Sequence, residues 1–145
     1  MIAAILALAA ASPLTCHPSI SRPWNDHTQT IGIDGMSFRR IRGRELRTTI
    51  AGHVTVPPDV SGLGHQGSKQ FLRNGTYIAE SNRGGEFQGR WSVARDVLWM
   101  KLSGQGYNRW MLFRSSDGSL AANVSNEGCM ETRRLRLQPV NEAAE

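Results

Sequence analysis

The chain has 145 residues, the size of one domain, and is long enough to bury about two thirds of its unfolded surface. With 39% hydrophobic residues and a negative mean hydropathy it fits a soluble protein, and its 15 glycines suit a fold with many tight turns. The formal charge of +5 comes from 17 basic and 12 acidic residues, and only Lys69 and Lys101 are lysines. A GC-rich genome would produce this arginine bias without selection for an arginine surface.

An apolar run opens the chain from Ile2 to Ala11 and is followed by Ser12 and Pro13. Ten apolar residues are too few to cross a bilayer, but they match the core of a signal peptide, and the alanines at their end suit a signal peptidase. No Lys or Arg precedes the run, which departs from the usual pattern, and a buried N-terminal helix is the alternative. We therefore expect a signal peptide over residues 1–11, no transmembrane segment, and a periplasmic or secreted protein.

Residues 12–30 are rich in Pro, Ser, Thr, Asn and His and show no periodicity, which predicts an extended N-terminal arm. Trp24 is the apolar exception, and we expect it to pack against the body of its own domain. The two cysteines are Cys16 and Cys129. An even number in an exported chain favours a disulfide, which would tie the arm to the last hairpin. Two free thiols are the alternative, and lipid attachment at Cys16 has less support because no small residue precedes it.

Arginines concentrate directly after the arm, at Arg39, Arg40, Arg42, Arg44 and Arg47. Leu46 and Ile50 lie one helical turn apart and Gly52 follows as a stop, so we predict a short helix over residues 44–51 that covers one end or one open side of a sheet. The arginines predict a contact with anionic lipid head groups, lipopolysaccharide or peptidoglycan carboxylates. The plainer interpretation is that they form the solvated face of this helix. Nucleic acid is not an expected partner, because exported proteins seldom meet it and aromatic residues for stacking are sparse here.

From His53 onward short strands alternate with turn signals. In residues 86–93, Phe87, Gly89 and Trp91 share one parity and polar residues take the other, which is typical of a strand with one buried face. Asn74-Gly75 is the strongest hairpin signal. The predicted strands cover residues 53–56, 71–73, 76–79, 87–93, 97–102, 107–114 and 119–124. A last strand follows Asn126-Glu127-Gly128, and in it Leu135 and Leu137 alternate with Arg134, Arg136 and Gln138. The residues expected to point inward are Phe71, Tyr77, Phe87, Trp91, Leu98, Met100, Leu112, Leu135 and Leu137.

A meander of this length hides its edges most directly by closing on itself. We therefore predict one all-β domain over residues 31–140, an antiparallel meander that closes into a small β-barrel of about eight strands with one short helix near its N-terminus. Residues 141–145 are expected to form a frayed tail.

Three segments carry a family resemblance: residues 43–52, the hairpin of residues 71–77, and the Gly-x-Trp strand at residues 89–93. With them the chain resembles the small lipocalin-like proteins exported by proteobacteria. The resemblance implies a calycin-like β-barrel in the periplasm and implies no catalytic residues. In that group the strand after Gly-x-Trp often carries a cysteine, whereas residues 97–99 have none here, so no disulfide arrangement is carried over from it.

These observations predict a non-enzymatic exported binding module that holds a small apolar ligand or a cell-envelope component. The expected ligand-binding residues are Tyr77, Phe87, Trp91, Leu98 and Met100. The plainer interpretation of Trp91 is that it fills the core while its neighbour Gly89 lets another backbone approach. The alternative function is a solid β-barrel that acts on a protein partner through its surface, as an interaction or inhibitor protein. We expect no cofactor and no metal site, because the four histidines have no ligand spacing, and no serine lies in a nucleophile elbow.

Overall fold

The computed structural model describes residues 16–17, 21–56, 67–80, 85–104 and 106–140, and the chain is all-β with one helix in these ranges. The predicted signal peptide, most of the loop after residue 56 and the predicted tail lie outside them. The elements are β1 (Arg22–Pro23), β2 (Thr30–Ile33), β3 (Met36–Arg40), α1 (Gly43–Ile50), β4 (His53–Thr55), β5 (Lys69–Phe71), β6 (Thr76–Glu80), β7 (Glu86–Ala94), β8 (Val97–Leu102), β9 (Tyr107–Ser115), β10 (Leu120–Asn126), β11 (Cys129–Leu135) and β12 (Leu137–Pro139).

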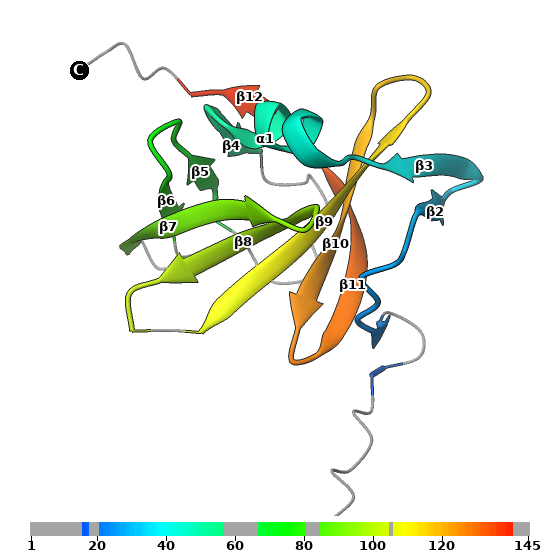
Figure 1. Ribbon diagram of the computed structural model, residues 1–145, viewed down its shortest axis with the longest axis horizontal. Coiled ribbons are helices and arrows are strands. Elements are labelled where there is room, and N and C mark those ends of the chain that lie inside the picture. The colour runs from blue at the N-terminus through cyan, green and yellow to red at the C-terminus, as the bar shows by residue number, and fades with distance from the viewer. Residues whose placement is uncertain (1–15, 18–20, 57–66, 81–84, 105, 141–145) are drawn as a thin grey trace, which may run out of the picture.

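The strands form one curved antiparallel sheet in the order β1-β11-β10-β9-β8-β7-β6-β5-β4-β12, with the β2–β3 hairpin attached to β9 (Figure 1). The sheet is barrel-like, but within the described ranges it has twelve strands rather than about eight, and its two margins stay open. The strands beyond the predicted number come from both ends of the chain. The N-terminal residues add β1, β2 and β3, and the last predicted strand divides at Arg136 into β11, which pairs with β10, and β12, which pairs with β4.

Helix α1 lies across one end of the curved sheet, close to β4 and β12 (Figure 1). Leu46 and Ile50 are fully buried on its apolar side, one turn apart as predicted. The Gly43 N–H at its first turn donates to Asp96 Oδ1 at 2.8 Å, and Gly52, with φ +73°, ends it. The left-handed conformation of Gly52 is the reason that the helix stops where the sequence indicated.

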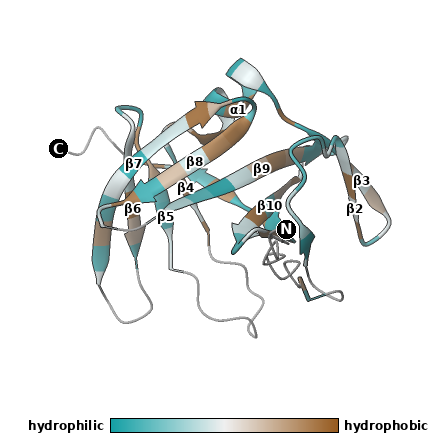
Figure 2. Cartoon of the chain, turned by 60° about the horizontal axis from the view of Figure 1, so that its bottom comes forward, coloured by the Kyte–Doolittle hydropathy of each residue, from teal (hydrophilic) through white to brown (hydrophobic). Residues whose placement is uncertain are grey.

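Two apolar cores lie on the two faces of the central strands. The inner core lies between the concave face of the sheet and α1 and includes Phe71, Tyr77, Trp91 and Trp110. The outer core lies between β8–β11 and the N-terminal segments; it contains Ile31, Phe38, Val97, Met111, Phe113, Ala121 and Met130. Figure 2 shows apolar colouring over parts of β8 and β9. Because both faces of β9 are covered in its middle, residues 110–113 form an uninterrupted apolar run, and its two ends are polar.

The β2–β3 hairpin, which the sequence analysis did not predict, covers part of the outer face. Its turn is Asp34-Gly35 with φ of 50° and 79°, so both central residues take the positive φ of a tight hairpin turn. Phe38 is fully buried in the outer core, and the hairpin pairs with β9 through Phe38, Arg39 and Arg40. Asp-Gly is the same kind of signal that identified Asn74-Gly75, so the sequence did contain it.

The N-terminal arm is fixed to β11. Cys16 and Cys129 form a disulfide with their Cα atoms 5.7 Å apart, which confirms the predicted pair. Pro23 of β1 pairs with Cys129, and the Trp24 N–H donates to the Gly128 carbonyl at 2.9 Å. Trp24 packs against the outer core, as predicted, and the guanidinium of Arg109 lies 4.2 Å from its ring centroid.

Candidate functional site

Four of the five predicted ligand-binding residues lie in the inner core: Tyr77, Trp91, Leu98 and Met100 are all buried. Their neighbours fill the space between the sheet and α1. The ring of Phe71 lies 5.2 Å from that of Tyr77 and 6.2 Å from that of Trp91, as centroid distances. The Trp91 Nε1–H donates to the Leu72 carbonyl at 2.7 Å, and burial raises the pKa of the Tyr77 phenol. These residues are in contact with one another and with α1, as core side chains are.

Phe87, the fifth residue, is 47% exposed and does not join the inner core, so its predicted inward burial is wrong. It shares its parity with Trp91 but lies four residues nearer the start of β7, which corresponds to about 13 Å along a strand. Helix α1 covers the Trp91 end, where the Arg47 guanidinium lies 5.5 Å from the indole centroid. Side-chain parity therefore predicted the correct face of the sheet for Phe87, but not how far α1 covers that face.

Gly89 marks a close approach of two backbones. A Cβ atom at this position would lie 1.9 Å from the Lys101 carbonyl oxygen on β8. Since Trp91 is at the same time buried in the inner core, the plainer interpretation of the Gly-x-Trp segment is the one that the structure confirms.

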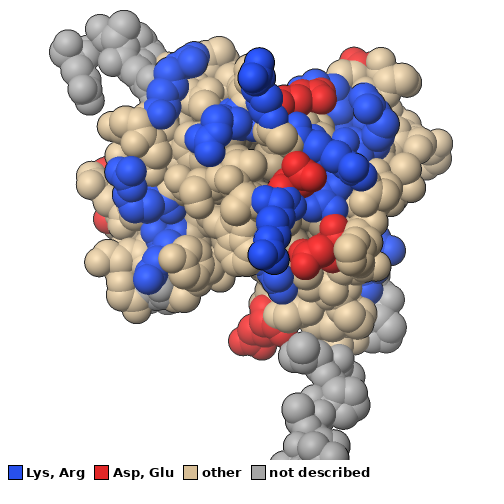
Figure 3. Space-filling view, viewed as in Figure 1, with Lys and Arg blue, Asp and Glu red and all other residues tan. Residues whose placement is uncertain are grey.

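The arginines predicted as an anionic contact separate into two groups. Arg40 is buried, and its guanidinium donates to the carbonyls of Asp26, Thr28 and Asp96. Burial, more than any neighbouring charge, lowers the pKa of Arg40. Its role in the fold is therefore to join the N-terminal arm to the β7–β8 turn. The other four are exposed: Arg39, Arg42, Arg44 and Arg47. Figure 3 shows Lys and Arg side chains gathered on this face of the molecule, with fewer acidic residues between them.

An open cleft of about 600 Å³ lies on this arginine-bearing side, between α1 and the strands below it. One wall is the polar side of α1, and the floor includes two half-exposed leucines. The residues that line it are Arg44, Glu45, Thr48, Thr49, His53, Arg114, Leu120 and Leu137. The cleft thus combines two guanidinium groups, one carboxylate and an aliphatic floor.

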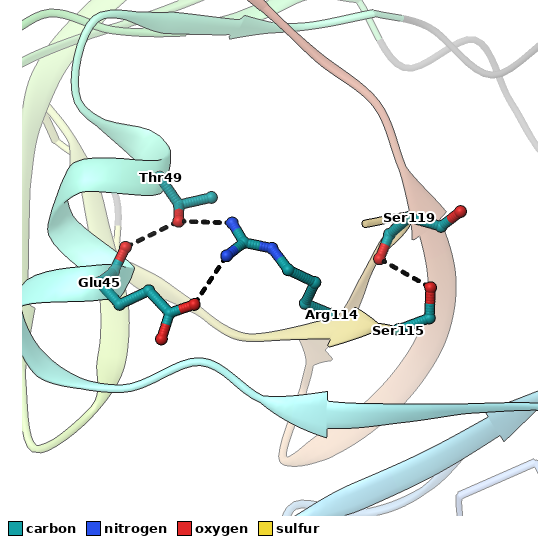
Figure 4. Close-up of polar contacts among 5 residues, drawn as sticks. All are labelled: Glu45, Thr49, Arg114, Ser115 and Ser119. Carbon is teal, nitrogen blue, oxygen red and sulfur yellow. Dashed lines mark hydrogen bonds and ion pairs between the residues drawn. The ribbon is translucent and has the colours of Figure 1, made fainter. Parts of the chain in front are cut away.

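Arg114 crosses the cleft from β9 to α1 (Figure 4). Its Nη1 donates to Glu45 Oε1 at 2.6 Å, and its Nη2 donates to Thr49 Oγ1 at 3.1 Å. The Thr49 hydroxyl in turn donates to the Glu45 carbonyl at 2.7 Å. One nitrogen of the guanidinium therefore binds the Thr49 hydroxyl and the other binds the Glu45 carboxylate, and both partners belong to α1.

Positive charge at the cleft exceeds negative charge. Arg39 on β3 is directly opposite Arg114 on β9, and like charges in that position repel each other. Arg44 adds a further cation, while Glu45 supplies the one carboxylate among the residues that line the cleft. The Arg114–Glu45 pair is solvated, since its side chains are 35% and 48% exposed, so it contributes little to stability.

The β9–β10 turn holds the edge of the cleft in place. The Asp117 carboxylate accepts hydrogen bonds from the Ser115 hydroxyl and the Ser119 N–H, and these bonds lower the pKa of Asp117 to about 2. The Ser115 N–H also donates to the Ser119 carbonyl at 2.9 Å. Leu120, which follows this turn directly, is thereby fixed opposite Arg114 in the floor.

Arg114, Thr49 and Leu120 were not among the predicted site residues. A signal for Arg114 was present, because it shares its parity with Trp110 and Leu112, two inner-core residues of the same strand. A cation at an inward position near a strand end indicates a polar contact above the core. Its partners on α1 could not be read from the sequence, since they come from a segment more than 60 residues away.

The sequence matches no protein-family model, and comparison with curated proteins and with solved structures finds no match. Over the described ranges, no helix is both long and apolar enough to cross a membrane. In the same residues no three His, Cys, Asp or Glu side chains lie together as a metal site would require.

Proposed function

We propose that this protein is a non-enzymatic exported binding module that holds an anionic component of the cell envelope on the exposed arginine surface beside α1. The observation that carries the proposal is the cleft, which Arg44 and Arg114 line together with a single carboxylate, Glu45, while Arg39 lies opposite Arg114 on the neighbouring strand. A surface with unbalanced charge attracts ligands of the opposite sign and binds them more weakly as salt is added. The disulfide is compatible with an exported protein, because such bonds persist in oxidising compartments.

The surface is a better candidate than the barrel interior for ligand binding. The residues expected to line an interior pocket pack against each other and against Leu46 and Ile50 of α1. A small apolar ligand in that position would have to displace side chains that are already buried. On this proposal the ligand site lies beside α1 at one end of the curved sheet and not in its packed interior.

Co-sedimentation with purified peptidoglycan sacculi tests the proposal, because sacculi carry many carboxylates on an insoluble polymer. We expect the protein to sediment at 50 mM salt and to be released at 500 mM salt. A double Arg39→Gln, Arg44→Gln variant should bind several-fold more weakly than a double Arg22→Gln, Lys101→Gln variant, which loses the same charge elsewhere. Equal binding by the two variants would show that net charge alone is responsible and would refute a defined surface.

An interaction with a protein partner is the second candidate, and the outer face of β8 and β9 favours it. Tyr107 is 63% exposed, its ring centroid lies 5.9 Å from that of Trp99, and the Lys101 ammonium is 5.0 Å from its ring. Trp99 is half-buried beside Tyr107, and Trp and Tyr are enriched among the residues that dominate protein interfaces. A photo-crosslinking amino acid at position 107 should then give a discrete adduct in cells that the same amino acid at Ser116 does not give.

A further inference from the structure

We propose that the cleft beside α1 binds the C-terminal carboxylate of a peptide whose last side chain is aliphatic, and that Glu45 is an internal competitor for this site. The inference rests on the proposed function and makes it specific, because it names the chemical group that the arginine surface takes.

Arg114 already binds a carboxylate in the required place. Its Nη1 lies 2.6 Å from Glu45 Oε1, and its Nη2 is oriented by the Thr49 hydroxyl at 3.1 Å. A guanidinium presents its donors in a fixed fork that matches carboxylate geometry. A ligand carboxylate can therefore replace that of Glu45 without rearrangement of Arg114.

The carboxylate of Glu45 is displaced from Arg114 at little cost in free energy. Both side chains of the pair are substantially solvated, and a solvated ion pair adds little stability. A displaced Glu45 carboxylate returns to water. The ligand carboxylate is then a second anion near Arg39, which lies opposite Arg114 and is repelled by it. The site therefore binds an external carboxylate with only a small penalty from its internal one.

The remaining walls of the cleft suit the last residue of a peptide. Leu120 and Leu137 are half-buried and give the floor an aliphatic surface that suits an apolar last side chain. The His53 Nδ1–H donates to the Ala51 carbonyl at 2.9 Å, so in the neutral imidazole Nε2 can accept a hydrogen bond from a peptide N–H. The exposed Thr48 hydroxyl offers a further polar partner.

The open shape of the cleft agrees with the end of a chain rather than an isolated small molecule. A peptide terminus places its carboxylate on Arg114 and its last side chain on the two leucines, and the rest of the peptide leaves through the open side. Capture of a terminal carboxylate by a few fixed donors is a recurring mode of peptide recognition.

The test uses three matched probes with the full-length mature protein: N-acetyl-alanyl-leucine, its C-terminal amide, and N-acetyl-alanyl-glycine. Titrations are followed by amide chemical shifts in ¹⁵N-labelled protein. We expect the free acid to bind with a Kd on the order of 0.1–1 mM, the range given by the usual free energy per atom for a ligand of this size. The shifts should be localised to α1 and the β9–β10 turn. The amide and the glycine probe should each bind at least about tenfold more weakly, since each lacks one of the two recognised groups.

Variants separate the roles of the two charged residues. Arg114→Gln should weaken binding of the acid by about tenfold or more, whereas Lys101→Gln should leave it within about twofold, because Lys101 pairs with Tyr107 at the other end of β9. Glu45→Gln should strengthen binding by up to about fivefold, because it removes the competing anion and keeps the side-chain shape.

The proposal is overturned if the amide binds as tightly as the acid, if Arg114→Gln behaves like Lys101→Gln, or if Glu45→Gln weakens binding. The Glu45→Gln and amide comparisons do not depend on the folding of the Arg114 variant. If the protein sediments with sacculi but none of the free probes binds, the peptide-terminus inference fails and the proposed surface stands. If the protein neither sediments with sacculi nor binds any of the free probes, the proposed function fails as well.

Discussion

Replacement of Gly89 by alanine is a sharp test of how the sheet is built. The added Cβ would lie 1.9 Å from the Lys101 carbonyl oxygen and 2.9 Å from the Leu102 Cα, about 1.5 Å and 0.5 Å short of an ordinary contact. Both neighbouring atoms belong to the backbone of β8, so they can move only if the β7–β8 ladder moves with them. Overpacking of this kind costs about 1–3 kcal/mol, and a backbone clash belongs at the upper end.

Alanine also restricts the unfolded chain, which stabilises a protein by about 0.4–1 kcal/mol at a compatible position. The expected net loss for Gly89→Ala is therefore about 2 kcal/mol. Gly106→Ala is the matched control, because nothing lies within 4 Å of its Cβ position and its φ is not positive. Gly106→Ala should be as stable as the wild type or slightly more stable, so only Gly89→Ala should lower the free energy of unfolding.

Urea unfolding followed by tryptophan fluorescence measures both variants, since Trp91 is two residues from the substitution. A loss of about 2 kcal/mol lowers the midpoint by about 1 M for a domain of this size. If Gly89→Ala and Gly106→Ala unfold at the same urea concentration, then β7 and β8 do not approach each other as closely as described, and the account of the Gly-x-Trp strand is wrong.

Three further predictions concern the fold. Double replacement of Cys16 and Cys129 by serine opens a loop of 113 residues and should cost about 4–5 kcal/mol in the chain-entropy model; a loss below about 1 kcal/mol in urea unfolding would contradict it. Leu46→Ala should cost about 2–5 kcal/mol because the side chain is fully buried under α1, while the exposed Thr48→Ala should stay within about 0.5 kcal/mol in the same measurement. Burial raises the pKa of Tyr77 in the folded state, so its contribution to stability is present below about pH 10 and is lost as the unfolded phenol ionises at higher pH. A Tyr77→Phe variant should therefore lose less stability between pH 9 and pH 11 than the wild type.

The sequence was sufficient for the elements whose pattern is local. Strand β8 begins and ends at the predicted residues, Val97 and Leu102, and α1 begins one residue before its predicted start. These predictions succeeded because alternation and helical spacing are properties of short segments. Turn residues with positive φ, such as Gly75, fixed where each hairpin reverses.

The features that depend on distant segments could not be predicted in the same way. Whether Phe87 is covered depends on where α1 ends above the sheet, and nothing within residues 86–93 records that. The division of the last strand at Arg136 depends on two different partners, β10 and β4, which are separated by many residues in the chain. Each of these is decided by packing between elements and not by periodicity within one.

Arg39 and Arg40 illustrate how much of the site the sequence contained. As neighbours in an arginine-rich segment they were treated alike, yet Arg40 is buried on backbone carbonyls and Arg39 is exposed. Alternation along β3 explains the difference, because Arg40 shares its parity with the buried Phe38. Recognition of the Asp34-Gly35 turn would have identified β3 and with it the two faces, so this error lies in the interpretation and not in the sequence.

The two sides of α1 connect the packed interior with the surface cleft. Leu46 and Ile50 close the inner core, and the opposite side of the same helix presents Arg44, Glu45 and Thr49 to the cleft. An interior ligand that entered at this end would require α1 to move away and expose both apolar side chains, at about 1.5–3 kcal/mol for each. Ligand binding in the cleft requires only the exchange of one solvated carboxylate for another. The same amphipathic helix therefore disfavours entry to the interior at this end and forms the wall of the site outside it.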